Sequence, residues 1–133
     1  MITKIDHIGI AVKATEESLR FWREGLGLQI GGSEVVEKQK VTATFLPIGA
    51  TNIELLEPSI PDSPVGKFIE SKGPGIHHVC FQVDDIAKTL EFLKSMGVSL
   101  INETPVPGAH GKLVAFVHPK STGGVLVELS QIP

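Results

Sequence analysis

Two histidines occupy equivalent places in two similar segments of this 133-residue chain. His7 lies at the head of DHIGIAV (residues 6–12), and His78 lies at the head of the apolar part of HHVCFQVDD (residues 77–85). A valine follows each histidine by five residues, and an amphipathic segment follows each stretch. A single histidine on an apolar strand is usually a core residue, whereas two at equivalent positions of a repeat indicate one site built from two similar parts. Because histidine is the commonest metal ligand, metal binding is the first hypothesis for this chain.

Two glutamates repeat in the same order as the histidines. Each half of the chain ends in a strand-like segment with an acid between aliphatic residues, NIELLEP with Glu54 and GVLVELSQ with Glu128. Two imidazoles and two carboxylates form an N2O2 ligand set, which suits a divalent ion such as cobalt, manganese, nickel, zinc or magnesium. Because the set contains no thiolate and an open coordination position is expected, the sequence predicts a catalytic rather than a structural metal site.

The elements that must position these residues follow the order β-α-β-β-β twice. Alternation and turn residues predict strands at 5–12, 28–38, 41–48, 52–57, 76–83, 98–102, 112–118 and 124–129. Capping residues predict a helix with Thr15 as its N-cap, a linker helix at about 63–73 and a helix at 86–96 capped by Asp84 or Asp85. The sequence therefore predicts one α+β domain over residues 1–133, with one module at about 3–58 and another at about 75–131.

Strand parity places the four candidate ligands on one kind of face. Side chains alternate along a strand, so the aliphatic residues of each strand share a face that packs on a helix. His7, Glu54, His78 and Glu128 all fall on the opposite parity, and we expect them to face one cavity. His77 is out of register by one residue and on the wrong face, so it is not expected to be a ligand.

Composition and charge exclude several classes of function. The hydrophobic fraction is 41%, the charged fraction 20% and the net charge −3, so no basic field attracts nucleic acid. No apolar run reaches the ~20 residues that span a bilayer, and MITKIDHIGI does not resemble a signal peptide. The single cysteine, Cys80, excludes an internal disulfide and is interpreted as a small packed residue. We expect a cytoplasmic protein with no nucleic-acid or membrane partner.

The paired modules with the order His, Glu, His, Glu resemble the vicinal oxygen chelate superfamily, and within it the methylmalonyl-CoA epimerase family. The stretches that carry the resemblance cover both ends of the chain and most of the second module. GAHGKLVAFVHPKSTGGVLVEL is the most specific, because the other two are shared with glyoxalase I and other relatives. The three are DHIGIAV (6–12), GIHHVCFQVDDI (75–86) and GAHGKLVAFVHPKSTGGVLVEL (108–129).

This resemblance implies a fold, a reaction and a set of site residues. The fold would be glyoxalase/bleomycin-resistance-like, with two tandem modules forming a curved, partly closed mixed sheet around a metal-binding cavity. The reaction would interconvert (2R)- and (2S)-methylmalonyl-CoA through an enolate, on a metal site at His7, Glu54, His78 and Glu128, with Co²⁺ the foremost ion. The Glu54 position is a glutamine in some epimerases.

The resemblance also implies two proton-transferring glutamates and an assembly. Glu128 is one. The resemblance places the other near the start of the third strand, and Glu37, in VVEKQK just before the strand predicted at 41–48, is assigned to it, with Glu34 left open as its alternative. From the residues alone, His110 and His118 are candidates for substrate contact, and Lys38, Lys40, Lys112 and Lys120 are candidates for contact with an anionic ligand, although exposure to solvent is the more common role of both residue types. A homodimer is expected. Two other functions stay open, a glyoxalase I (lactoylglutathione lyase)-type isomerase and a non-enzymatic protein of the superfamily that binds a small molecule.

Overall fold

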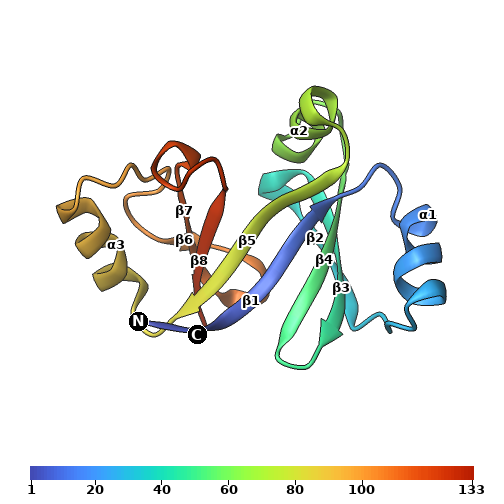
Figure 1. Ribbon diagram of the computed structural model, residues 1–133, viewed down its shortest axis with the longest axis horizontal. Coiled ribbons are helices and arrows are strands. Elements are labelled where there is room, and N and C mark those ends of the chain that lie inside the picture. Colours follow the sequence, from blue (N-terminus) through green and yellow to red (C-terminus); the bar gives the residue numbers. More distant parts are fainter. The chain divides into compact units, whose positions relative to one another are not determined.

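The computed structural model describes residues 1–133 and shows the order β-α-β-β-β in each half of the chain (Figure 1). By contacts the chain divides into two compact units. One unit consists of Ile8–His77, and the other of Met1–His7 together with His78–Pro133. The chain therefore passes between the units directly after His7 and directly before His78.

The unit Ile8–His77 is a sheet with a different helix on each face. Its strand order is β2-β3-β4-β1, and β2, β3 and β4 are antiparallel neighbours. One face carries Leu46, Ile53 and Leu55 and packs on Leu19 of α1, and the other carries Ala43, Phe45 and Leu56 and packs on Val65 of α2. The bounds are Ile2–Ala11 for β1, Thr15–Leu19 for α1, Gly32–Val36 for β2, Val41–Ile48 for β3, Thr51–Pro58 for β4 and Pro64–Lys72 for α2.

The second unit packs one helix on one face of a mixed sheet. The start of β1 is followed in the sheet by β5, β8, β7 and β6, and β5 pairs with β8 in parallel. Leu90 of α3 packs against Val83, Val117 and Leu129, which leaves the opposite parity of β5 and β8 for His78 and Glu128. The bounds are Gly75–Val83 for β5, Ile86–Ser95 for α3, Val106–Pro107 for β6, Leu113–Val117 for β7 and Val127–Gln131 for β8.

Capping side chains explain where two of the helices begin. Ser63 accepts a hydrogen bond from the N–H of Gly66 at 3.0 Å and Pro64 follows it, so the linker helix begins where the sequence predicts. Asp85, rather than Asp84, caps α3 through the N–H of Lys88 at 3.0 Å.

Several predicted elements differ from those observed. The predicted N-cap Thr15 is the first residue of α1, whose cap is Ala14, and α1 continues as a π-helical segment, Arg20–Gly25. The strand predicted at 98–102 is reduced to a single bridge between Leu100 and Val117, because Asn102 uses its side-chain carbonyl to accept from the N–H of Phe116. Glu37 does not lie in a strand but begins a 3₁₀ turn, Glu37–Gln39. Two further 3₁₀ turns are Ala109–Gly111 and Pro119–Ser121. No helix has the length and apolar character needed to cross a membrane.

Candidate metal centre

Three of the four predicted ligands converge within the unit that contains residues 78–133. The Nε2 atoms of His7 and His78 lie 2.9 Å apart. Glu128 Oε1 lies 3.2 Å from the first and 3.0 Å from the second. All three side chains are buried. These atoms form a compact triangle with one carboxylate oxygen and two imidazole nitrogens.

The pairing of the strands brings these side chains together. Cys80 and Glu128 are register partners in the parallel pair β5–β8, so His78, two residues before Cys80, shares their face. Phe116 of β7 is the antiparallel partner of Glu128, and its ring lies 5.9 Å from the ring of His78. The His7 ring meets that of His78 edge-on, with 5.0 Å between centroids. The aliphatic side chains on the opposite face of β5 and β8 pack on α3. A register shift of one residue would therefore turn Glu128 into this aliphatic layer.

The tautomer of His7 favours a proton or a metal ion at the centre of the triangle. His7 Nδ1 donates to Asp6 Oδ2 at 2.7 Å, so a neutral ring presents the lone pair of Nε2 toward His78 and Glu128. If His78 is also neutral with its proton on Nδ1, two nitrogen lone pairs and one carboxylate oxygen face each other at about 3 Å. Such an arrangement repels itself unless a proton or a metal ion lies among the three atoms.

The spacing of the donor atoms suits a metal ion. Bonds of about 2.1 Å to nitrogen and oxygen place neighbouring ligands of an octahedral ion about 3.0 Å apart, and those of a tetrahedral ion about 3.4 Å apart. The three separations, 2.9, 3.0 and 3.2 Å, are closer to the octahedral value. Three donors on one side of an ion leave positions open for further ligands, and a substrate can use them.

The electrostatics of the site keep Glu128 ionised. Burial alone would raise the pKa of its carboxyl, but the hydrogen bonds and charges of His7 and His78 outweigh burial and lower the pKa to about 2. Glu128 is therefore a carboxylate at neutral pH, the state in which it can bind a cation.

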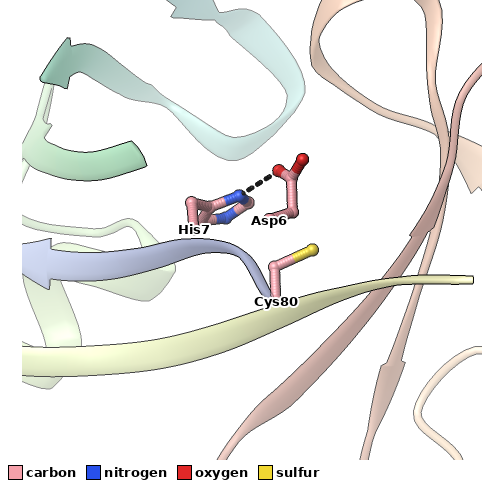
Figure 2. A group of neighbouring side chains, drawn as sticks. All are labelled: Asp6, His7 and Cys80. Atoms are coloured by element: carbon pink, nitrogen blue, oxygen red, sulfur yellow. Dashed lines mark hydrogen bonds and ion pairs between the residues drawn. The ribbon is translucent and has the colours of Figure 1, made fainter. Parts of the chain in front are cut away.

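Sequence reasoning missed Asp6, which contacts His7, and did not connect Lys112 with it. Asp6 is buried, and its second oxygen, Oδ1, accepts from Lys112 Nζ at 3.0 Å. Burial opposes the ionised state of Asp6, yet the hydrogen bonds from His7 and Lys112 hold its pKa below its usual range. An acid directly before the histidine in DHIGIAV was the available signal. Cys80 lies beside Asp6 and His7 (Figure 2), with its sulfur within 4.8 Å of their ligand atoms, and burial raises the pKa of its thiol.

Comparison with known proteins identifies the family. Residues 6–116 match the model of the Glyoxalase/Bleomycin resistance protein/Dioxygenase superfamily. The chain belongs to this superfamily. The superfamily is typically metal-dependent, which agrees with the donor set of the triangle.

Individual relatives in the superfamily match almost the whole chain. The uncharacterized protein YqjC of Bacillus subtilis (strain 168) is 42% identical, covering 98% of this chain and 93% of the relative. The ethylmalonyl-CoA/methylmalonyl-CoA epimerase of Cereibacter sphaeroides is 40% identical, covering 99% of this chain and 100% of the relative. A solved structure of a methylmalonyl-CoA epimerase in complex with methylmalonyl-CoA and NH4⁺ is 36% identical, covering 99% of this chain and 96% of the other, with a TM-score of 0.94. The predicted resemblance to the epimerases and the predicted α+β glyoxalase-like fold are both confirmed.

The remaining site candidates lie in the unit Ile8–His77. Glu54 is half-buried on β4, on the face that carries Phe45 and Leu56, so its part in the metal site stays a prediction. Glu34 lies on β2 opposite Ala43, which places it on that same face. Glu37 is exposed at the end of β2, and no hydrogen bond or ion pair holds its carboxylate.

The remaining three histidines, His77, His110 and His118, are not among the converging ligands. The ring of His77 packs edge-on against Phe68, with 4.9 Å between the ring centroids. His118 accepts from the N–H of Lys120 at 3.1 Å and caps the turn that follows β7. His110 is exposed in the turn before β7, with a positive φ of 58°.

Proposed function

We propose that this protein is a metal-dependent methylmalonyl-CoA epimerase. The observation that carries the proposal is the match, over 99% of the chain and with a TM-score of 0.94, to an epimerase structure that holds methylmalonyl-CoA. The converging His7, His78 and Glu128 supply the site for its chemistry. Epimerases are isomerases, so the epimerase relatives support the prediction that this protein is an isomerase.

The chemistry needs a stabilised enolate and two proton-transferring groups. The C2 proton of methylmalonyl-CoA lies between a thioester carbonyl and a carboxylate, and its removal gives an enolate. A divalent ion held by His7, His78, Glu128 and Glu54 would supply a Lewis acid for the thioester and carboxylate oxygens. Co²⁺ is the first candidate, with Mn²⁺, Ni²⁺, Zn²⁺ and Mg²⁺ as alternatives for an N2O2 set.

Glu128 serves as one of the two bases. Its Oε1 faces the two imidazoles, so the other oxygen, Oε2, takes the C2 proton from one face of the substrate. A carboxylate with a pKa of about 2 is a weak base. The site must therefore also stabilise the enolate, which lowers the pKa of the C2 proton toward that of Glu128.

Glu37 serves as the second base, on the opposite face of the substrate. Its carboxylate has no intramolecular partner, so no ion pair must be broken before it accepts a proton. Glu34, on the face that carries Glu54, is the alternative.

Paired variants decide between these two glutamates. We expect Glu37→Gln to lower the rate of proton exchange about 10²–10⁴-fold from one epimer, because that epimer presents its C2 proton to the missing base. Glu34→Gln is the matched control and retains exchange with both epimers. The reverse pattern, measured by proton NMR with each pure epimer, assigns the role to Glu34.

Exchange in D2O tests the function itself. Metal-loaded protein should replace the C2 proton of methylmalonyl-CoA with deuterium and interconvert the epimers, and chelator-treated protein should lose both activities. Absence of exchange together with turnover of methylglyoxal and glutathione would support a glyoxalase I-type isomerase instead. Tight binding of a small molecule with neither reaction would indicate a non-enzymatic member of the superfamily.

The assembly in which the enzyme acts is expected to be a homodimer, as the family resemblance implies. Static light scattering of the purified chain distinguishes a dimer from a monomer.

A further inference from the structure

Asp6 contacts His7 through the ring nitrogen that does not face His78 and Glu128. Its Oδ2 accepts the Nδ1–H of His7 at 2.7 Å, and its side chain is 4% exposed. A neutral ring that donates Nδ1–H to a fixed carboxylate has its Nε2 free of protons and aimed in one direction. Carboxylates in this position orient ligand histidines and raise their basicity toward a metal.

Lys112 contacts the other carboxylate oxygen of Asp6, Oδ1, which also lies 3.8 Å from Lys4 Nζ. Lys112 Nζ donates to Asp6 Oδ1 at 3.0 Å, and the Lys112 side chain is 21% exposed. The backbone of Lys112 closes the preceding loop, because its carbonyl accepts from Gly108 N–H at 2.8 Å and its N–H donates to Ala109 at 3.2 Å. Lys112 therefore connects the loop before β7 to the ring of His7 through one carboxylate.

A second metal ion is the competing interpretation of the same residues. Ligand atoms of Asp6, His7 and Cys80 lie within 4.8 Å of one another (Figure 2). Both oxygens of Asp6 already accept hydrogen bonds, and the ammonium group of Lys112 lies 3.0 Å from one of them. A cation placed there would displace the Nδ1 proton of His7 and meet that ammonium charge at short range. The charges favour an orienting role for Asp6.

We propose that Lys112 and Asp6 are positioning residues that fix the tautomer and direction of the His7 ring, so that its Nε2 faces the metal. The inference rests on the proposed metal site formed by His7, His78 and Glu128. It adds two residues that bind neither metal nor substrate and act through His7. It also ties metal affinity to the loop at residues 108–112.

Metal affinity without substrate tests the role of Asp6. In Asp6→Asn the amide can donate to Nδ1 and leave the His7 proton on Nε2, as an amide does in place of the catalytic aspartate of serine proteases. We expect Co²⁺ affinity, measured by titration of the Co²⁺ absorption bands, to fall about 10–100-fold. An affinity equal to that of the unchanged chain would overturn the proposal.

Variants of Lys112 test whether it acts through Asp6. Lys112→Met should weaken Co²⁺ binding, and Lys112→Arg should restore it, because arginine keeps a charged donor. Lys94→Met is the matched control, since it removes an exposed lysine with a carboxylate partner at 2.8 Å, Glu103. The double variant Asp6→Asn/Lys112→Met should bind Co²⁺ as weakly as Asp6→Asn alone. Losses that multiply would show that Lys112 acts independently and would contradict the proposed pair.

The ring of His7 gives a readout that needs no metal. Nitrogen-15 NMR of the metal-free chain, with His7 assigned by the loss of its signals in His7→Gln, should show a proton on Nδ1. Asp6→Asn should move the proton to Nε2. A His7 ring with its proton on Nε2 in the unchanged chain would overturn the positioning role even if metal binds.

Two further outcomes separate this proposal from the proposed function. No Co²⁺ binding to the unchanged chain, with the Nδ1 tautomer present, would overturn the metal site while leaving the orientation of the ring. Two equivalents of Co²⁺ per chain, with a thiolate charge-transfer band lost in Cys80→Ser, would overturn the positioning role in favour of the second metal ion.

Discussion

The central residues of the site are buried and contact each other rather than solvent. His7 donates to Asp6 through one nitrogen and faces His78 and Glu128 through the other. His78 lies 3.0 Å from Glu128. Because these groups are in direct contact, a change of charge at one of them changes the interactions of the others.

The metal-free protein should lose stability in acid because of Glu128. Its folded-state pKa is depressed from 4.5 to about 2, so its contribution is present above pH 4.5 and is lost as the pH falls toward 2. The contribution is on the order of 3 kcal/mol. We expect urea unfolding with chelator present to show this fall, and Glu128→Gln to flatten it. Equal pH slopes for the two chains between pH 4.5 and 2 would contradict the prediction.

The converging ligand candidates could be predicted from the sequence, but the residues that contact His7 and hold its ring could not. The repeat predicted His7, His78 and Glu128 from strand parity, and the structure brings all three together. Asp6 lies next to His7 in sequence, where strand alternation alone would direct it to the other face. Lys112 is 106 positions away, so only the fold reveals its contact.

At the scale of elements, regular apolar patterns predicted strands well and short polar segments did not. Strand β3 has the bounds that the sequence predicts, 41–48, because alternation and flanking turns define both ends. The segment at 98–102 alternates similarly but forms one bridge, since Asn102 and Ser99 form hydrogen bonds that replace those of a strand. The π-helical turn at Arg20–Gly25 has no simple sequence signature.

The loop before β7 should control metal affinity through its close packing at Gly108. A Cβ at this position would lie 2.6 Å from Val114 Cγ1, so Gly108→Ala must move the loop that carries Lys112. We expect weaker Co²⁺ binding in Gly108→Ala, in the direction of Lys112→Met. Adding Val114→Ala makes room for the methyl group and should recover part of the affinity.

Another glycine supplies the matched control for this loop. Gly97 has a φ of +81°, so Gly97→Ala strains the backbone after α3 and lowers stability by about 1 kcal/mol. Its Co²⁺ affinity should stay unchanged in isothermal titration of the folded protein. A loss of affinity in Gly97→Ala as large as that in Gly108→Ala would show that general destabilisation, not the position of Lys112, explains the effect.

At the scale of the whole molecule, the chain enters and leaves the unit Ile8–His77 beside the two histidines. His7 and His78 are the residues on either side of that unit, and both belong to the other unit with Glu128. Each histidine is therefore held by a strand, β1 or β5, that continues into the other unit. Metal binding would fix the two strands to one another at these positions, so it should stabilise the fold.

Thermal unfolding measures this coupling between the metal and the fold. A ligand that binds only the folded state at 100 times its Kd adds about 2.7 kcal/mol, and at roughly 3 °C per kcal/mol for a domain of this size the Tm should rise by about 8 °C. His7→Ala/His78→Ala should abolish the rise, because two of the three converging donors are gone. His77→Ala is the matched control. It removes the contact with Phe68 and should lower the Tm of the metal-free protein, yet it should keep the full rise with Co²⁺. Loss of the rise in His77→Ala, with its retention in the double variant, would place the metal on His77 and contradict the parity argument that selected His78.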